Sequence, residues 1–142
     1  MQAEVFLDTA YAIALSSPND LFHQRAISLA DQLEAADTRL VTTRAVLLEI
    51  GNALSKQRYR SAAVRLLAAL DADPHVETVP LSEQLYARAV QLYRERLDKE
   101  WGLTDCVSFM VMQVRGITEA LTTDEHFQQA GFTGLMREGS SP

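Results

Sequence analysis

The run Val5-Phe6-Leu7-Asp8-Thr9, near the start of the chain, joins a continuous apolar stretch to two good helix-capping residues. A short apolar run that ends in this way predicts a buried strand followed by a helix. The same pattern returns near the other end, where residues 117–123 predict a strand and Asp124 the start of a short helix. Further strands are expected at 40–42 and 76–79, and a last edge strand at 135–136.

Helical spacing of apolar residues fills the segments between these strands. The expected helices cover residues 21–36, 43–57, 61–72, 82–98 and 104–115. The last of them is apolar nearly all round and stops at Gly116, as expected of a helix inside a domain. Strands that alternate with helices predict an α/β fold, a single-domain α/β/α sandwich with a mainly parallel sheet. We expect the domain over residues 1–137 and a flexible tail at 138–142.

The composition narrows the class of protein. At 142 residues the chain has room for one domain, and 47% hydrophobic with 23% charged residues indicates a folded globular protein. A net charge of -6 disfavours nucleic-acid binding through overall basic charge, so any such contact must be local. A single cysteine, Cys106, excludes an internal disulfide and a cysteine-based zinc site. Without a long apolar span or a basic N-terminus, a cytoplasmic protein with no membrane contact is expected.

Two acids follow directly on predicted strands. Asp8 and Asp124 each end an apolar run, and parallel strands would bring both carboxylates to the same edge of the sheet. Open α/β sheets bind their ligands at this edge. For either residue alone, a simple helix cap is an equally good interpretation.

Two further acids interrupt apolar helices. Glu49 lies between Val46 and Ala53 in helical spacing, so we expect it to be at least half buried. Asp105 opens the most apolar helix, where the helix dipole favours a carboxylate and a helix-end charge is the plainer explanation. If the four acids converge, their repulsion must be relieved by protons or by a cation. Oxygen ligands alone select Mg²⁺ or Mn²⁺, which activates water for metal-assisted phosphodiester hydrolysis.

Four blocks of sequence hold these acids in order. They are residues 5–9 (VFLDT), 42–54 (TTRAVLLEIGNAL), 103–109 (LTDCVSF) and 116–127 (GITEALTTDEHF). The blocks resemble a PIN domain, and most closely the VapC-type toxins of bacterial toxin-antitoxin pairs. Each block alone is a weak signal, whereas four in order are specific, and the likeness runs from about residue 4 to 137.

The resemblance implies an α/β/α sandwich with Mg²⁺- or Mn²⁺-dependent endoribonuclease activity on single-stranded RNA, through metal-activated water. The catalytic residues carried over are Asp8, Glu49, Asp105 and Asp124, with the metal on Asp8, Asp105 and Asp124. Thr9 and Thr123 flank the site as supporting residues. The family also implies a small cognate antitoxin that inserts a segment into the acidic pocket, and a homodimer.

One departure keeps a second function open. Ala10 stands where many relatives carry a serine, which favours an alternative: a catalytically inactive module that binds RNA or protein and keeps the fold. His126, two residues after Asp124, is expected on the surface and outside the site. Cys106 and Trp101 are expected to pack in the core.

A short basic segment is the candidate for local RNA contact. Lys56, Arg58 and Arg60 surround Tyr59, a combination suited to phosphate contacts and base stacking. A solvated helix face is the plainer interpretation of this segment. Arg44, which is not on the helical face of Glu49, is a further candidate for contact with RNA or antitoxin.

Overall fold

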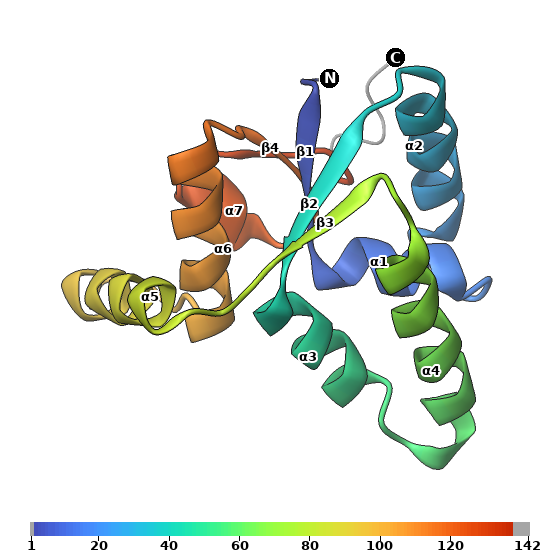
Figure 1. Cartoon of the computed structure of the whole chain (residues 1–142), viewed down its shortest axis with the longest axis horizontal. Coiled ribbons are helices and arrows are strands. Elements are labelled where there is room, and N and C mark those ends of the chain that lie inside the picture. The colour runs from blue at the N-terminus through green and yellow to red at the C-terminus, as the bar shows by residue number, and fades with distance from the viewer. Residues whose placement is uncertain (1, 138–142) are drawn as a thin grey trace.

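The protein, described here from a computed structural model covering residues 2–137, is built on a parallel sheet of five strands. The strands are β1 (Glu4–Leu7), β2 (Arg39–Thr43), β3 (Val76–Val79), β4 (Glu119–Leu121) and β5 (Thr133–Gly134), in the order β3-β2-β1-β4-β5. Figure 1 shows β1 at the centre of this sheet. The tail expected at 138–142 lies outside the described residues.

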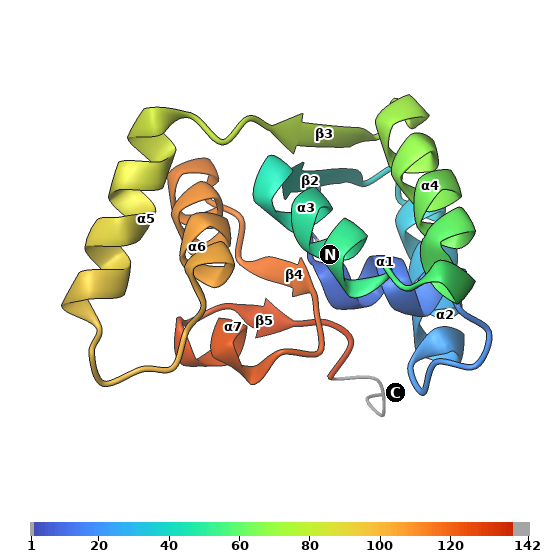
Figure 2. The same ribbon diagram turned by 90° about the horizontal axis from the view of Figure 1, so that it is seen from below.

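Seven helices surround the sheet in the described part of the chain. They are α1 (Thr9–Ser16), α2 (His23–Ala35), α3 (Arg44–Ala53), α4 (Gln57–Ala72), α5 (Glu83–Glu95), α6 (Leu103–Arg115) and α7 (Glu125–Gln129). Helices α1, α2 and α4 lie on one side of the sheet and α5, α6 and α7 on the other (Figures 1 and 2). Helix α3 lies past the end of β2 and contacts α1, α4 and α6. The predicted α/β/α sandwich is confirmed.

Burial explains why β1 has no polar alternation. Because helices cover both faces of the sheet, Val5, Phe6 and Leu7 are all 0 to 1% exposed. Phe6 pairs in register with Val41 on one side and with Ala120 on the other. None of the helices described for this chain is long and apolar enough to cross a bilayer.

Several boundaries differ from the sequence expectation. Strand β4 covers only Glu119–Leu121 rather than 117–123. Strand β5 is Thr133–Gly134, whereas the predicted pair Leu135 and Met136 is buried just after it, because apolar residues there fill the core without extending the strand. Helix α3 ends at Ala53 and α4 already begins at Gln57, so the basic segment starts a helix instead of continuing one.

The strand order fixes where a site can form. From β1 the chain moves outward through β2 to β3, and then crosses to the opposite side of β1 to form β4 and β5. The direction of winding therefore reverses between β1 and β4, and open α/β sheets bind ligands beyond the carboxyl ends of the strands at such a point. Asp8 follows β1 here, and Asp124 lies three residues past the end of β4.

Candidate active site

Asp8 is the most buried of the four predicted acids. Its side chain occupies the N-cap position of α1 without making the capping hydrogen bond, so capping does not account for it. Burial raises the pKa of Asp8 to about 7; Thr122 and the Thr9 backbone act against this through hydrogen bonds, and the charges of Glu49 and Asp105 add to it. Within residues 2–137 it forms no ion pair with a basic side chain. Such a carboxyl group requires either a proton or a bound cation.

Thr122 links the two strand ends. Its Oγ1 donates a hydrogen bond to Asp8 Oδ2 at 2.7 Å and accepts one from the backbone N–H of Asp124 at 3.0 Å. The side chain is fully buried. Sequence reasoning favoured Thr123 for a supporting role, but the Thr123 hydroxyl has no hydrogen bond among the described residues. Only the register of β1 with β4 would have pointed to Thr122. Leu7 pairs with Leu121, so the next residues, Asp8 and Thr122, lie side by side.

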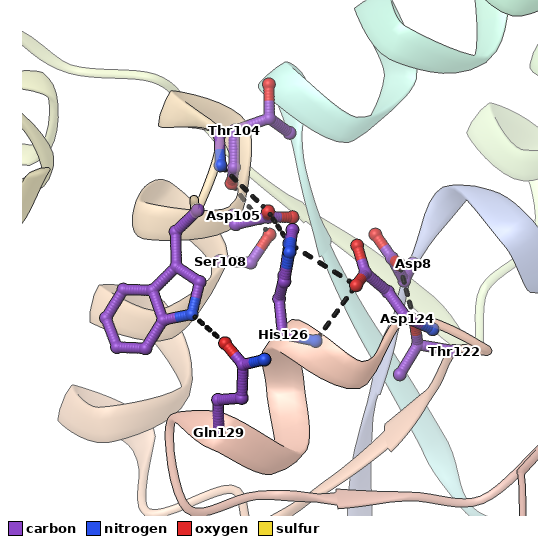
Figure 3. A network of polar contacts seen from close by, with 10 residues as sticks. Asp8, Thr104, Asp105, Ser108, Thr122, Asp124, His126 and Gln129 are labelled. Atoms are coloured by element: carbon purple, nitrogen blue, oxygen red, sulfur yellow. Dashed lines mark hydrogen bonds and ion pairs between the residues drawn. The ribbon is translucent and has the colours of Figure 1, made fainter. Parts of the chain in front are cut away.

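Asp124 and His126 form the second part of the cluster. Asp124 Oδ1 accepts from the backbone N–H of His126 at 2.9 Å, so Asp124 also caps α7, the alternative that the sequence left open. The imidazole of His126 turns back, and its Nδ1 lies 3.3 Å from Asp124 Oδ1 and 3.0 Å from Asp105 Oδ2 (Figure 3). The expectation that His126 stays outside the site is wrong, because α7 packs against α6 and brings the ring between the two acids.

Charge surrounds the His126 ring on two sides. Burial acts to lower its pKa, but the hydrogen bond to Asp105 and the charges of Asp124, Asp105 and Glu125 outweigh burial and raise the pKa above its ordinary value. The two acids therefore favour the protonated form of this ring. His126 is the member of the cluster that sequence reasoning placed outside the site.

Asp105 enters the cluster from α6. Its Oδ2 accepts a hydrogen bond from the backbone N–H of Gly102 at 3.0 Å, which fixes the carboxylate at the start of the helix. The neighbouring Cys106 is fully buried, and burial together with the Asp105 charge raises the pKa of its thiol to about 11. Trp101 is also buried and packs edge-on against Phe109. The expectation that Cys106 and Trp101 are core residues is confirmed.

Glu49 differs from the other three acids because it is exposed. It was expected to be at least half buried, whereas the structure places it among the exposed residues, because α3 turns Ala45, Val46, Leu47 and Ile50 inward. Thr9 Oγ1 donates to Glu49 Oε1 at 2.5 Å, which ties this acid to the residue next to Asp8. The charges of Glu49 and Asp105 both act on the pKa of Asp8, and Asp105 meets Asp124 at the His126 ring, so the four acids form one cluster.

The cluster suits a hard divalent cation. Asp105, Asp124 and His126 each offer one ligand atom, and these atoms lie within 4.8 Å of one another. Asp8 reaches Asp124 through Thr122 and lacks a cationic partner of its own in the described residues. Carboxylate oxygens are the ligands that Mg²⁺ and Mn²⁺ prefer. The residues present therefore fit the predicted cation.

A pocket begins beside the acids. It has a volume of about 300 Å³ and its lining includes Glu49, Asn52, Tyr86 and Thr104. Because Glu49 borders the pocket and Thr104 precedes Asp105, a molecule placed there would lie next to the cluster. Tyr86 is half exposed and presents an aromatic ring to this space.

The basic residues predicted for RNA or antitoxin contact are all exposed: Arg44, Lys56, Arg58 and Arg60. The last three lie where α3 leads into α4, at the end of α3 away from the sheet (Figure 1). The Arg60 guanidinium donates to the Ser55 carbonyl, and Arg58 lies over the Tyr59 ring. No hydrogen bond or ion pair among the described residues joins them to the acids.

With this fold and cluster in place, comparison with known proteins identifies the family. The PIN domain model matches residues 5–133, and the chain belongs to the PIN domain family. The chain is also 29% identical over 135 residues to the 23S rRNA-specific endonuclease VapC20 from two strains of Mycobacterium tuberculosis, covering 94% of this chain and 99% of the relative. The predicted family resemblance is confirmed.

Solved structures agree with this assignment. The crystal structure of Mycobacterium tuberculosis VapC20, described as a sarcin-ricin loop cleaving toxin, is similar with a TM-score of 0.79 and 28% identity, covering 91% of this chain and 96% of that one. VapBC2 from Rickettsia felis, solved with a DNA fragment of its promoter, has a TM-score of 0.68 at 14% identity, over 92% and 96% of the two chains. At that identity the second likeness is one of fold.

Proposed function

We propose that this protein is a divalent-metal-dependent endoribonuclease, the toxin of a VapBC-type toxin-antitoxin pair. The observation that carries the proposal is the convergence of four acids at the point where the sheet reverses its winding, with Asp8 buried and unpaired among the described residues. The near full-length likeness to a 23S rRNA-specific endonuclease supports RNA as the substrate.

Different residues of the cluster would bind the metal, position a ligand and accept a proton. Asp8, Asp105 and Asp124 would hold Mg²⁺ or Mn²⁺, which when bound stabilises charge on the phosphate and activates water. Thr122 holds Asp8 in place. Glu49 uses Oε1 for the bond from Thr9, and its Oε2 has no hydrogen-bond partner in the described chain, so it can accept a proton at the exposed edge of the cluster.

Partners follow from charge and exposure. A small antitoxin with a basic side chain would neutralise the acid cluster, and Leu48, 60% exposed next to Glu49, offers it an apolar contact. The RNA backbone or the antitoxin would meet the exposed basic residues Arg44, Lys56, Arg58 and Arg60. A homodimer, expected from the family, completes the proposal.

Cleavage assays test the proposed function directly. Purified protein, freed of antitoxin, is incubated with a single-stranded RNA pool and with 23S ribosomal RNA, in Mg²⁺, in Mn²⁺ and in chelator. We expect metal-dependent products that disappear in the double variant Asp8→Asn, Asp105→Asn. They should persist in the control double variant Asp31→Asn, Asp71→Asn, which removes the same charge from exposed helix positions.

Two outcomes would contradict the proposal. Cleavage retained by Asp8→Asn, Asp105→Asn would show that the acids are not the site. Folded wild-type protein that gives no products, and binds RNA equally well in chelator, would favour the inactive binding module.

A further inference from the structure

The imidazole of His126 joins two acids that come from different helices. Its Nδ1 lies 3.0 Å from Asp105 Oδ2 at the start of α6 and 3.3 Å from Asp124 Oδ1, just before α7. The side chain is 25% exposed, so water competes little for these contacts. A bare nitrogen lone pair would be repelled by two carboxylate oxygens at this distance, and Nδ1 therefore carries a hydrogen.

Each oxygen that faces the ring is also held by a backbone amide. The N–H of Gly102 donates to Asp105 Oδ2 at 3.0 Å, and the N–H of His126 itself donates to Asp124 Oδ1 at 2.9 Å. The second oxygen of each acid, Asp105 Oδ1 and Asp124 Oδ2, has no hydrogen bond within residues 2–137. The imidazole thus faces the same carboxylate oxygens that accept hydrogen bonds from the backbone.

We propose that His126 is a positioning residue. Its Nδ1–H donates to Asp105 Oδ2 and faces Asp124 Oδ1, the two oxygens that backbone amides also hold, and so leaves Asp105 Oδ1 and Asp124 Oδ2 for the cation (Figure 3). The proposal rests on the function proposed above. It differs from direct ligation by Nδ1, which requires that Nδ1 lose its hydrogen and that both carboxylate contacts break. Partners that orient metal ligands in this way typically change metal affinity by about 10- to 100-fold.

Mn²⁺ affinity is the first test, because it needs no RNA cleavage. We expect His126→Ala to bind Mn²⁺ about 10- to 100-fold more weakly than wild type, as measured by the free Mn²⁺ signal in electron paramagnetic resonance. His126→Asn should recover part of the affinity, since its amide nitrogen can take the place of Nδ1 as donor. Gln128→Ala, an exposed change on the same helix, should leave affinity unchanged. Circular dichroism checks that all variants fold.

A spectroscopic measurement separates positioning from ligation. Electron spin echo modulation of the Mn²⁺-loaded wild type should show no directly bonded nitrogen. A directly bonded nitrogen that is lost in His126→Ala would overturn the proposal and make His126 a ligand.

The two proposals fail in different ways. Wild-type affinity in His126→Ala, with binding lost in Asp8→Asn, would overturn the positioning role alone. Folded wild-type protein that binds no Mn²⁺ would contradict the proposed function and the positioning role together.

Discussion

The two sides of the acid cluster differ in how the fold holds them. On the sheet side, Asp8 follows the central strand and is 6% exposed, with Thr122 bonded to it from the neighbouring strand. On the helix side, Glu49 projects from α3 into solvent and is held by Thr9. A carboxyl group at a strand end inside a covered sheet is dehydrated and fixed. A carboxyl group on a helix past the edge of the sheet is in contact with water.

This difference suits two chemical tasks. A buried carboxyl group without a cationic partner favours a cation strongly, because charge neutralisation also offsets the cost of dehydration. An exposed carboxylate near the cluster contacts solvent and can pass protons to it. Substitutions on the two sides of the cluster should therefore affect different properties of the protein.

The largest effect is expected on metal binding and cleavage. Asp8→Asn should weaken Mn²⁺ binding by about 100-fold or more, because it removes a charged ligand from a dehydrated position. Glu49→Gln should slow cleavage by about 100-fold, through loss of a proton acceptor, with Mn²⁺ affinity unchanged. Titration calorimetry and single-turnover cleavage on both variants measure this. Equal loss of Mn²⁺ affinity in both would remove the distinction between the two sides.

The second effect is on stability in chelator. At pH 8 Asp8→Asn should raise the free energy of unfolding by about 1 to 2 kcal/mol, because a buried charge without a cation is replaced by an amide that still accepts from Thr122. The gain should shrink at pH 5, where Asp8, with a folded pKa of about 7, is protonated in the folded wild type.

The sign of this pH dependence follows from the direction of the shift. Since the pKa in the folded protein lies above the ordinary 3.8, metal-free wild type should lose stability as pH rises from about 4 through 7. Glu49→Gln should stay within about 0.5 kcal/mol of wild type, as exposed substitutions usually do. Urea unfolding at the two pH values measures both variants, and a destabilised Asp8→Asn would contradict the account of Asp8.

The third effect compares the two threonines. Thr122→Val leaves Asp8 Oδ2 and the Asp124 N–H without their partner in a buried place, and should cost about 1 to 3 kcal/mol. Thr9→Val frees an exposed Glu49 that water can satisfy, and should cost about 0.5 kcal/mol. Thr123→Val serves as control. Thermal or urea unfolding that ranks Thr9→Val above Thr122→Val would reverse the comparison.

The smallest effect concerns the basic segment, which lies apart from both sides of the cluster. The double variant Lys56→Gln, Arg58→Gln should modestly weaken RNA binding in chelator. It should also lower the slope of log affinity against log salt concentration by about 1, since each phosphate contact with a single strand contributes about 0.7 to the slope. Fluorescence anisotropy across a salt series measures the slope. A slope identical to wild type would mean that these residues contact solvent only.

Most of the fold could be predicted because each strand carries its own local signal. Apolar runs that end at a cap or a turn identified β1, β2 and β3 within a residue or two. Asp8, Asp105 and Asp124 stood out for the same reason, since each follows or opens an apolar element. The short strand β5 was misplaced by two residues, because two buried apolar residues next to it look like a strand in sequence.

The rest depends on how elements far apart in sequence approach one another. Helical period shows which face of α3 carries Glu49, but it does not show whether another element covers that face. Thr122 bonds Asp8 through the register of β1 with β4, across 114 positions of sequence. His126 meets Asp105 because α7 packs on α6. Neither register nor helix packing leaves a mark in the local pattern.

The single cysteine can report local opening of the structure next to the acid cluster. Cys106 is wholly buried next to Asp105, and burial raises the pKa of its thiol to about 11, so the folded protein holds little of the reactive thiolate. A thiol reagent can modify it only after the structure around it has opened, so the labelling rate measures how often this region opens. A cation held by Asp105 would have to leave before this opening, and labelling should slow as the cation concentration rises. The chain therefore carries a native chemical reporter of local opening, one residue from a carboxylate of the cluster.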